Sequence, residues 1–238
     1  MGSLITFINI SGCFYIVMGI KYQPMNISSY LCAMSFQTNI KLGNITNLSD
    51  ARFAAAAGAT YIGFCFDPMN EHYITPIKAK EIIDWVTGSS VVAEFGNQSL
   101  EEIRDISELL NVDVIEVNNT FLPDELLSLG KPIIKKVNVN VFTKEKLQHA
   151  ITAYEKVADA FHVYADSETE TYDCDQLVSL CQSHQLIWGL QLNTGNVLNI
   201  LSSFKPFGIN LVGGTEEKAG MKDFDELNDL FDVLRTED

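Results

Sequence analysis

Basic side chains are scarce in this sequence. It contains 16 Lys and Arg against 31 Asp and Glu among 238 residues, which gives a formal net charge of −15. A surface of that charge repels polyanions over most of its area, so the composition argues against nucleic acid as a partner. Hydrophobic residues make up 47% of the chain and charged residues 20%, a balance that supports a buried core and argues against disorder.

The sequence also lacks paired cysteines. Its five cysteines are odd in number, and no two of them form a Cys-x-x-Cys motif. Most of them stand in apolar or helical surroundings, which indicates reduced thiols in a cytoplasmic compartment and no metal site.

No apolar run is long enough for an ordinary membrane span. The N-terminal candidate, residues 4–20, is interrupted by Asn9, Ser11 and Gly12 and falls just short of the roughly 20 residues required. No Lys or Arg precedes it and no small-residue cleavage site follows it, so it is a poor signal peptide. We expect residues 1–37 to be an N-terminal extension outside the barrel. Residues 1–33 are either an appendage or the result of a misassigned start, in which case translation begins at Met34; a membrane anchor is the less favoured alternative.

Short apolar runs alternate with amphipathic segments from residue 39 onward, which is typical of repeated βα units on a parallel sheet. Eight such pairs predict a single-domain (β/α)8 TIM barrel over residues 38–236. An open doubly wound sheet is the alternative, but no Gly-x-Gly-x-x-Gly follows the first strand. The expected strands are 39–42, 60–66, 90–95, 112–117, 131–137, 159–164, 186–190 and 208–212, and the expected helices begin near 49, 76, 99, 123, 143, 173, 195 and 223.

Two motifs resemble the phosphoribosylanthranilate isomerase family of tryptophan biosynthesis. Residues 40–68, IKLGNITNLSDARFAAAAGATYIGFCFDP, are similar to the family's opening Lys-Ile-Cys-Gly-Ile-Thr, an Asp-Ala helix start and Ile-Gly-Phe-x-Phe. Residues 205–231, KPFGINLVGGTEEKAGMKDFDELNDLF, are similar to the segment that carries the family's eighth strand. The resemblance covers residues 38–235 and implies a barrel that isomerises a phosphoribosylamine to a 1-deoxyribulose phosphate, with no cofactor or metal.

That reaction is an Amadori rearrangement, which needs a general acid at the sugar-ring oxygen and a general base at the neighbouring carbon. In the family the base is the Cys of the opening motif, where this sequence has Gly43. The family's acid is an Asp at the end of the sixth strand, where this sequence has Tyr164, with Asp166 two residues later. The resemblance thus implies a diverged member without the usual pair.

Phosphate binding is the second role that the resemblance implies. Gly213, Gly214 and Thr215 follow the eighth strand, where backbone N–H groups can approach an anion, and Asn193 is a further candidate contact. The family's two glycines after the seventh strand are Leu190–Gln191 here. We therefore expect at most weak binding of a small phosphorylated sugar.

Charged residues recur on three consecutive expected strands. Glu94, Glu116 and Lys135 are either a polar layer inside the barrel or, in part, side chains that point outward between the helices. Cys65 and His162 lie within strands and are expected to be structural.

Two functions remain open from the sequence. The first is a barrel that has lost the isomerisation and serves in binding, which is favoured because loss of an acid or base costs about 10²–10⁴ in rate. The second is an active isomerase of N-(5'-phosphoribosyl)anthranilate or a related phosphorylated sugar, with Glu116, Glu94 or His72 as substitute base. Neither the ligand nor the oligomeric state follows from the sequence.

Overall fold

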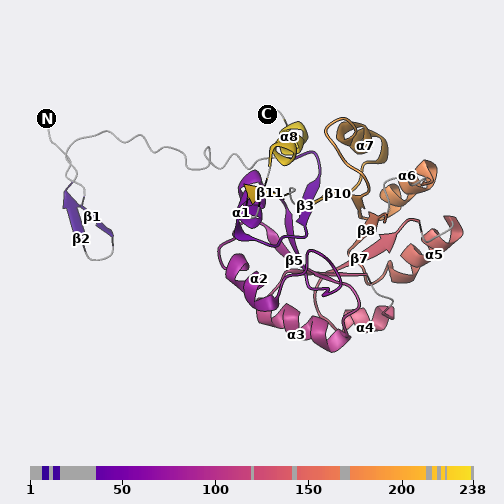
Figure 1. Cartoon of the computed structure of the whole chain (residues 1–238), viewed down its shortest axis with the longest axis horizontal. Coiled ribbons are helices and arrows are strands. Elements are labelled where there is room, and N and C mark those ends of the chain that lie inside the picture. Colours follow the sequence, from indigo (N-terminus) through magenta and orange to yellow (C-terminus); the bar gives the residue numbers. More distant parts are fainter. Residues whose placement is uncertain are drawn as a thin grey trace. The chain divides into compact units, whose positions relative to one another are not determined.

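Eight parallel strands close into a barrel that is ringed by helices (Figure 1). The strand order is β10-β3-β4-β5-β6-β7-β8-β9, and each expected strand overlaps one observed strand, so the (β/α)8 TIM barrel prediction is confirmed. The strands are β3 (Asn39–Gly43), β4 (Tyr61–Cys65), β5 (Ser90–Phe95), β6 (Val114–Val117), β7 (Ile133–Asn138), β8 (Ala160–Tyr164), β9 (Leu186–Gly189) and β10 (Gly208–Val212). The helices are α1 (Leu48–Ala57), α2 (Pro76–Ile83), α3 (Leu100–Leu110), α4 (Pro123–Leu127), α5 (Lys144–Tyr154), α6 (Cys174–Ser183), α7 (Val197–Phe204) and α8 (Asp225–Leu234).

The computed structural model divides into two units, residues 1–35 and 36–238. The first contains an antiparallel hairpin of β1 (Phe7–Ile10) and β2 (Cys13–Ile16), and the second contains the barrel and a short pair, β11 (Glu216–Lys218) and β12 (Met221–Lys222). That residues 1–37 form an extension outside the barrel stays a prediction, although the Phe36 ring contacts Phe231 edge-on and the backbone N–H of Gln37 donates to the Leu234 carbonyl at 3.2 Å. The structure describes residues 7–10, 13–16, 36–118, 121–140, 144–166, 172–212, 216–218, 221–222 and 224–236.

Side-chain caps stand at three of the expected helix starts. The Asn47 side chain accepts a hydrogen bond from the backbone N–H of Asp50 at 2.9 Å, which caps α1. Thr75 caps α2, whose first residue is Pro76. At α3, Ser99 and Glu102 form a reciprocal capping box. Each cap supplies a partner for a backbone N–H that the first turn of a helix leaves unpaired.

Side chains alternate along the strands, so the barrel has two apolar regions, one between the strands and the helices and one inside the barrel. Every second residue packs outward against the helices, and Trp188 and Phe161 are among the largest of these buried side chains. The remaining residues face the barrel axis, as the two-residue period of a strand requires. At the amino ends of the strands this interior is closed by a small apolar cluster made of Val92, Val114, Ile134, Ala160 and Ile187.

Candidate active site

Above the apolar floor, the barrel interior is filled by charged side chains. Lys41, on β3, is only 1% exposed, and its Nζ lies 2.5 Å from Glu94 Oε1 and 3.1 Å from Glu116 Oε2. It also donates to Asn210 Oδ1 at 3.0 Å. A buried ammonium persists only when acceptors replace its lost water, and three acceptors from three other strands do so here.

His162 extends this network across the barrel. Its Nδ1 lies 3.1 Å from both carboxylate oxygens of Glu116, whereas its Nε2 is buried without a hydrogen-bond partner among the described residues. Burial lowers the pKa of His162 despite the pull of Glu116, which keeps the ring neutral. We call Lys41, Glu94, Glu116, His162 and Asn210 the interior charge cluster.

Protonation within the cluster is governed by the two ion pairs of Lys41. Burial by itself raises the pKa of Glu116, but the Lys41 ammonium and the His162 ring outweigh it and hold that pKa well below its usual range. Burial likewise opposes the charge on Lys41, yet Glu116 and Glu94 together raise its pKa above the ordinary value. Lys41 and Glu116 are therefore charged at neutral pH, and Glu116 is a weak base.

Two glycines make room for the Glu94 carboxylate. A Cβ at Gly63 would lie 2.0 Å from Glu94 Oε1, and a Cβ at Gly43 would lie 2.9 Å from the same oxygen. The carboxylate thus occupies the space beside the end of β3, where its Oε2 accepts a 3.4 Å hydrogen bond from the backbone N–H of Asn44. Asn44 has a positive φ of 58°, so the turn after Gly43 uses a left-handed conformation that asparagine tolerates.

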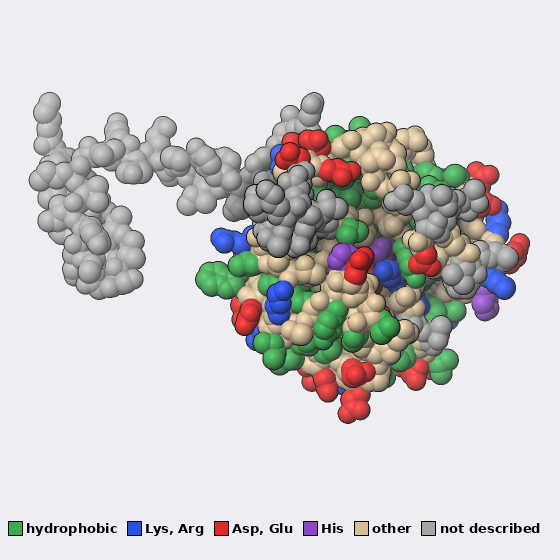
Figure 2. All heavy atoms as spheres, viewed as in Figure 1, with side chains coloured by type: hydrophobic (Ala, Val, Ile, Leu, Met, Phe, Trp, Pro, Cys, Tyr) green, Lys and Arg blue, Asp and Glu red, His purple; other side chains and the backbone are tan. Residues whose placement is uncertain are grey.

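Polar side chains from three strands form the mouth of the barrel above this cluster. The Tyr164 hydroxyl donates to Asn118 Oδ1 at 3.3 Å, and Lys136 Nζ lies 4.5 Å from the centroid of the Tyr164 ring. Asn138 donates from Nδ2 to the Asp166 carboxylate. In the space-filling view, His, acidic and basic side chains gather at the centre of this face (Figure 2).

The sequence pattern of the N-(5'-phosphoribosyl)anthranilate (PRA) isomerase family matches residues 40–233 of this chain. The chain belongs to this family. A relative from Aquifex aeolicus, named N-(5'-phosphoribosyl)anthranilate isomerase, is 30% identical over 206 residues, which cover 83% of this chain and 98% of the relative. Another of that name, from Thermotoga maritima, is 25% identical over 201 residues, covering 79% and 94%.

Solved structures of the family share the barrel. Phosphoribosyl anthranilate isomerase from Thermotoga maritima superposes with a TM-score of 0.72 at 22% identity, covering 83% of this chain and 98% of that chain. A PRA isomerase in complex with reduced 1-(o-carboxyphenylamino)-1-deoxyribulose 5-phosphate has a TM-score of 0.70 at 24% identity, with the same coverage. At these identities the likeness establishes the fold alone.

Gly43 and Tyr164, which the sequence resemblance aligns with the family's base and acid, both lie at the mouth. Gly43 ends β3 and Tyr164 ends β8, so each stands at the carboxyl end of its strand, where TIM barrels carry their chemistry. Asp166 is exposed just beyond β8 and is oriented by Asn138. Glu116 lies deeper, 2% exposed within the interior charge cluster, while His72 is half-buried in the loop after β4 beside Glu71.

The expected phosphate contacts are only partly described. Gly213, Gly214 and Thr215 lie outside the described residues. Asn193 is exposed in the loop after β9, and its Oδ1 accepts hydrogen bonds from the backbone N–H groups of Gly195 and Asn196 at 2.9 and 3.1 Å. The Asn193 side chain therefore shapes the turn that leads into α7.

Glu94 and Glu116 form the interior layer, but Lys135 does not join it. Lys135 Nζ donates to the backbone carbonyl of Asn118 at 3.1 Å and lies 5.2 Å from the Tyr154 ring on α5. Of the two alternatives for this residue, the outward one is correct, and the neighbouring Lys136 faces the mouth instead. Cys65 is 5% exposed, and burial raises the pKa of its thiol to about 11.

Sequence reasoning missed the centre of the cluster, Lys41. The signal was present, because Lys41 stands two residues before Gly43 and so faces the same interior side of β3. Within the described residues, no group of three or more His, Cys, Asp or Glu side chains is arranged to hold a metal ion. Across the same residues, no helix combines the length and hydropathy that a membrane crossing requires.

Proposed function

We propose that this barrel binds a small phosphorylated sugar at its mouth and does not isomerise N-(5'-phosphoribosyl)anthranilate, because Gly43 and Tyr164 replace the base and the acid of the family. The observation that carries the proposal is the Glu94 carboxylate, which fills the space beside Gly43. The family's base is a side chain at that position, and glycine has none. The free thiols of Cys65, Cys174 and Cys181 support a reducing, cytoplasmic location.

The surroundings of Gly43 argue against a simple substitute for the missing thiol. Glu116 is buried, and its ion pair with Lys41 makes it a poor proton acceptor at neutral pH. The Tyr164 hydroxyl, at the acid position, is engaged with Asn118. Since an acid or a base each contributes about 10²–10⁴ in rate, absence of both leaves little turnover.

Purified full-length protein tests this proposal in a fluorescence assay of PRA turnover, alongside rescue of a tryptophan auxotroph that lacks the isomerase. We expect no turnover and no rescue. Turnover by the wild-type protein in either assay would overturn the proposal.

Restoring the family's residues provides a matched test. The change Gly43→Cys places a Cβ against Glu94, so it has to be combined with Glu94→Ala to leave room for the thiol. We expect the combination Gly43→Cys, Glu94→Ala and Tyr164→Asp to give trace turnover, and the same set without Gly43→Cys to give none.

An active isomerase is the second candidate function, and the comparisons favour it. The curated relatives described above bear the name of that activity, and one solved family member holds a phosphorylated sugar-anthranilate ligand. Glu94 is the substitute base that lies nearest to Gly43 in this case, since a Cβ at Gly43 would lie 2.9 Å from its Oε1, although the same oxygen is paired with Lys41 Nζ at 2.5 Å. The variant Glu94→Gln keeps the shape and removes the base, so it abolishes turnover only if this second function is correct.

Ligand binding is tested separately from turnover. We expect inorganic phosphate and ribose 5-phosphate to shift backbone amide resonances at the mouth, including that of Asn138, with dissociation constants in the millimolar range, equivalent to about 4 kcal/mol. Unchanged mouth resonances at tens of millimolar of both compounds would contradict the binding proposal.

A further inference from the structure

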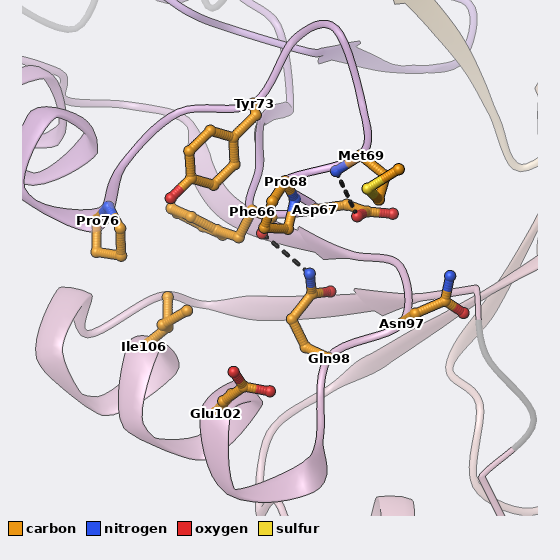
Figure 3. Close-up of a pocket in the computed structure, with 10 residues that line it drawn as sticks. All are labelled: Phe66, Asp67, Pro68, Met69, Tyr73, Pro76, Asn97, Gln98, Glu102 and Ile106. Carbon is orange, nitrogen blue, oxygen red and sulfur yellow. Dashed lines mark hydrogen bonds between the residues drawn. The ribbon is translucent and has the colours of Figure 1, made fainter.

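A cavity lies outside the barrel interior. It has a volume of about 410 Å³ and lies between the loop after β4 and the start of α3 (Figure 3). Figure 3 shows Tyr73, Phe66 and Pro76 along one side, with Ile106, Glu102 and Gln98 facing them. None of these residues belongs to the interior charge cluster or to the mouth. The full lining is Phe66, Asp67, Pro68, Met69, Tyr73, Pro76, Asn97, Gln98, Glu102 and Ile106.

The lining of this cavity has an unbalanced charge. It contains two carboxylates, Asp67 and Glu102, and none of its described lining residues is Lys, Arg or His. Glu102 Oε2 accepts from the backbone N–H and the hydroxyl of Ser99, both at 2.8 Å, and these bonds lower the pKa of Glu102. Asp67 uses Oδ1 to accept from the backbone N–H of Met69 at 3.0 Å. Glu102 Oε1 has no hydrogen-bond partner among the described residues, whereas Asp67 Oδ2 lies against Gly96, where a Cβ would be 1.8 Å from it.

The rest of the lining is apolar or aromatic. Phe66, Tyr73, Pro68, Met69, Pro76 and Ile106 supply a surface that excludes water from an apolar ligand body, and the volume is within the range of small-molecule sites. The Met69 side chain is 88% exposed at this site, so it can move over an occupant without leaving a packed core.

We propose that this cavity binds a small organic cation, namely an ammonium group carried on an aromatic or apolar body. The ammonium would be attracted by Glu102 and Asp67, and the faces of Phe66 and Tyr73 favour cations over neutral groups of the same shape. An anion of the same size would meet two carboxylates with no compensating cation. The net charge of −15 adds a long-range attraction for the same sign of ligand. This site is independent of the function proposed for the barrel mouth.

Three probes of similar shape separate charge from hydrophobicity: 2-phenylethylammonium, 2-phenylethanol and 3-phenylpropionate. We would titrate each into the full chain at low salt and follow backbone amide resonances. We expect 2-phenylethylammonium to shift the amides of Met69, Asn97 and Gln98, and 2-phenylethanol to bind about tenfold more weakly, because it loses both the ion pairs and the cation–π contact. We expect 3-phenylpropionate to leave these amides unchanged.

The variant Glu102→Gln removes one charge and keeps the capping acceptor for Ser99, so the helix start is preserved. We expect it to weaken binding of 2-phenylethylammonium about threefold to tenfold, and Asp67→Asn, which keeps the acceptor for Met69, to do the same. Glu101→Gln is the matched control, because Glu101 is in the same helical turn but does not line the cavity, and it should leave binding unchanged. Equal binding of 2-phenylethanol and 2-phenylethylammonium, an equal effect of Glu101→Gln, or the absence of shifts at these amides would overturn the proposal.

Discussion

Gly63→Ala is the change that most directly tests where the Glu94 carboxylate lies. A Cβ at Gly63 would meet Glu94 Oε1 at 2.0 Å and Glu94 Cδ at 2.7 Å, both far inside van der Waals contact. The next nearest atom is Gly43 Cα at 3.2 Å, and Gly63 does not have a positive φ, so the backbone itself tolerates alanine. The substitution therefore has one main consequence, displacement of Glu94 from Lys41.

The expected cost follows from that displacement. Breaking a buried ion pair by removing one partner costs about 3–5 kcal/mol, and here Lys41 retains Glu116 and Asn210, so we expect Gly63→Ala to lower the free energy of unfolding by about 2–4 kcal/mol. In a Glu94→Ala background the clash with the carboxylate is gone, and the 3.2 Å contact with Gly43 Cα remains. The reduced freedom of the unfolded chain contributes about 0.4–1 kcal/mol and offsets that tight contact, so we expect Gly63→Ala to be close to neutral there.

Urea unfolding of the wild type, both single variants and the double variant measures this coupling as a double-mutant cycle. We expect the cost of Gly63→Ala to fall close to zero in the Glu94→Ala background. If Gly63→Ala costs the same free energy in both, within about 0.5 kcal/mol, the carboxylate does not occupy this space. That result would remove the main observation behind the proposal that this barrel does not catalyse the isomerisation.

Three further predictions concern the rest of the barrel. Burial lowers the pKa of Lys135 from 10.5 to about 8, so the chain takes up a proton when it unfolds between these pH values. The free energy of unfolding therefore rises with pH in this window, by up to about 1.4 kcal/mol per pH unit. Lys135→Met should remove that rise in urea titrations at pH 8 and 9.5. Ser99→Ala should cost about 1 kcal/mol in the same assay, because it removes the cap of α3, whereas Ser203→Ala, at an exposed position of α7, should be close to neutral. A chain that begins at Met34 should keep the thermal unfolding midpoint of the full chain, and a large drop would show that residues 1–33 contribute to the barrel.

Local sequence patterns determined the order and type of the barrel elements. Apolar runs of strand length alternate with amphipathic segments, and each pattern depends only on residues that are close in the chain. The helix starts at Asn47, Thr75 and Ser99 were predictable for the same reason, since a cap bonds to an N–H two or three residues away. The glycine at position 43 was likewise visible without any coordinates, because the motif around it is continuous.

The face that a charged residue occupies was decided by tertiary structure. Lys135 and Lys136 are adjacent and chemically identical, yet one packs toward Tyr154 on α5 and the other lies against Tyr164 at the mouth. Because strand side chains alternate, a shift of one residue in register exchanges their environments, and the register depends on pairing with β6 and β8. No local pattern distinguishes two neighbouring lysines.

The interior charge cluster and the cavity beside α3 were also decided by the tertiary structure. Glu94 fills the space beside Gly43 and Gly63 only because β3, β4 and β5 are hydrogen-bonded neighbours, although Gly43 and Glu94 are far apart in the chain. The cavity likewise needs Tyr73, in the loop after β4, and Ile106, on α3, to line the same space. Contacts of this kind form when the strands close on themselves, so composition and periodicity determine that there is a barrel, while the closed sheet determines which side chains share its interior.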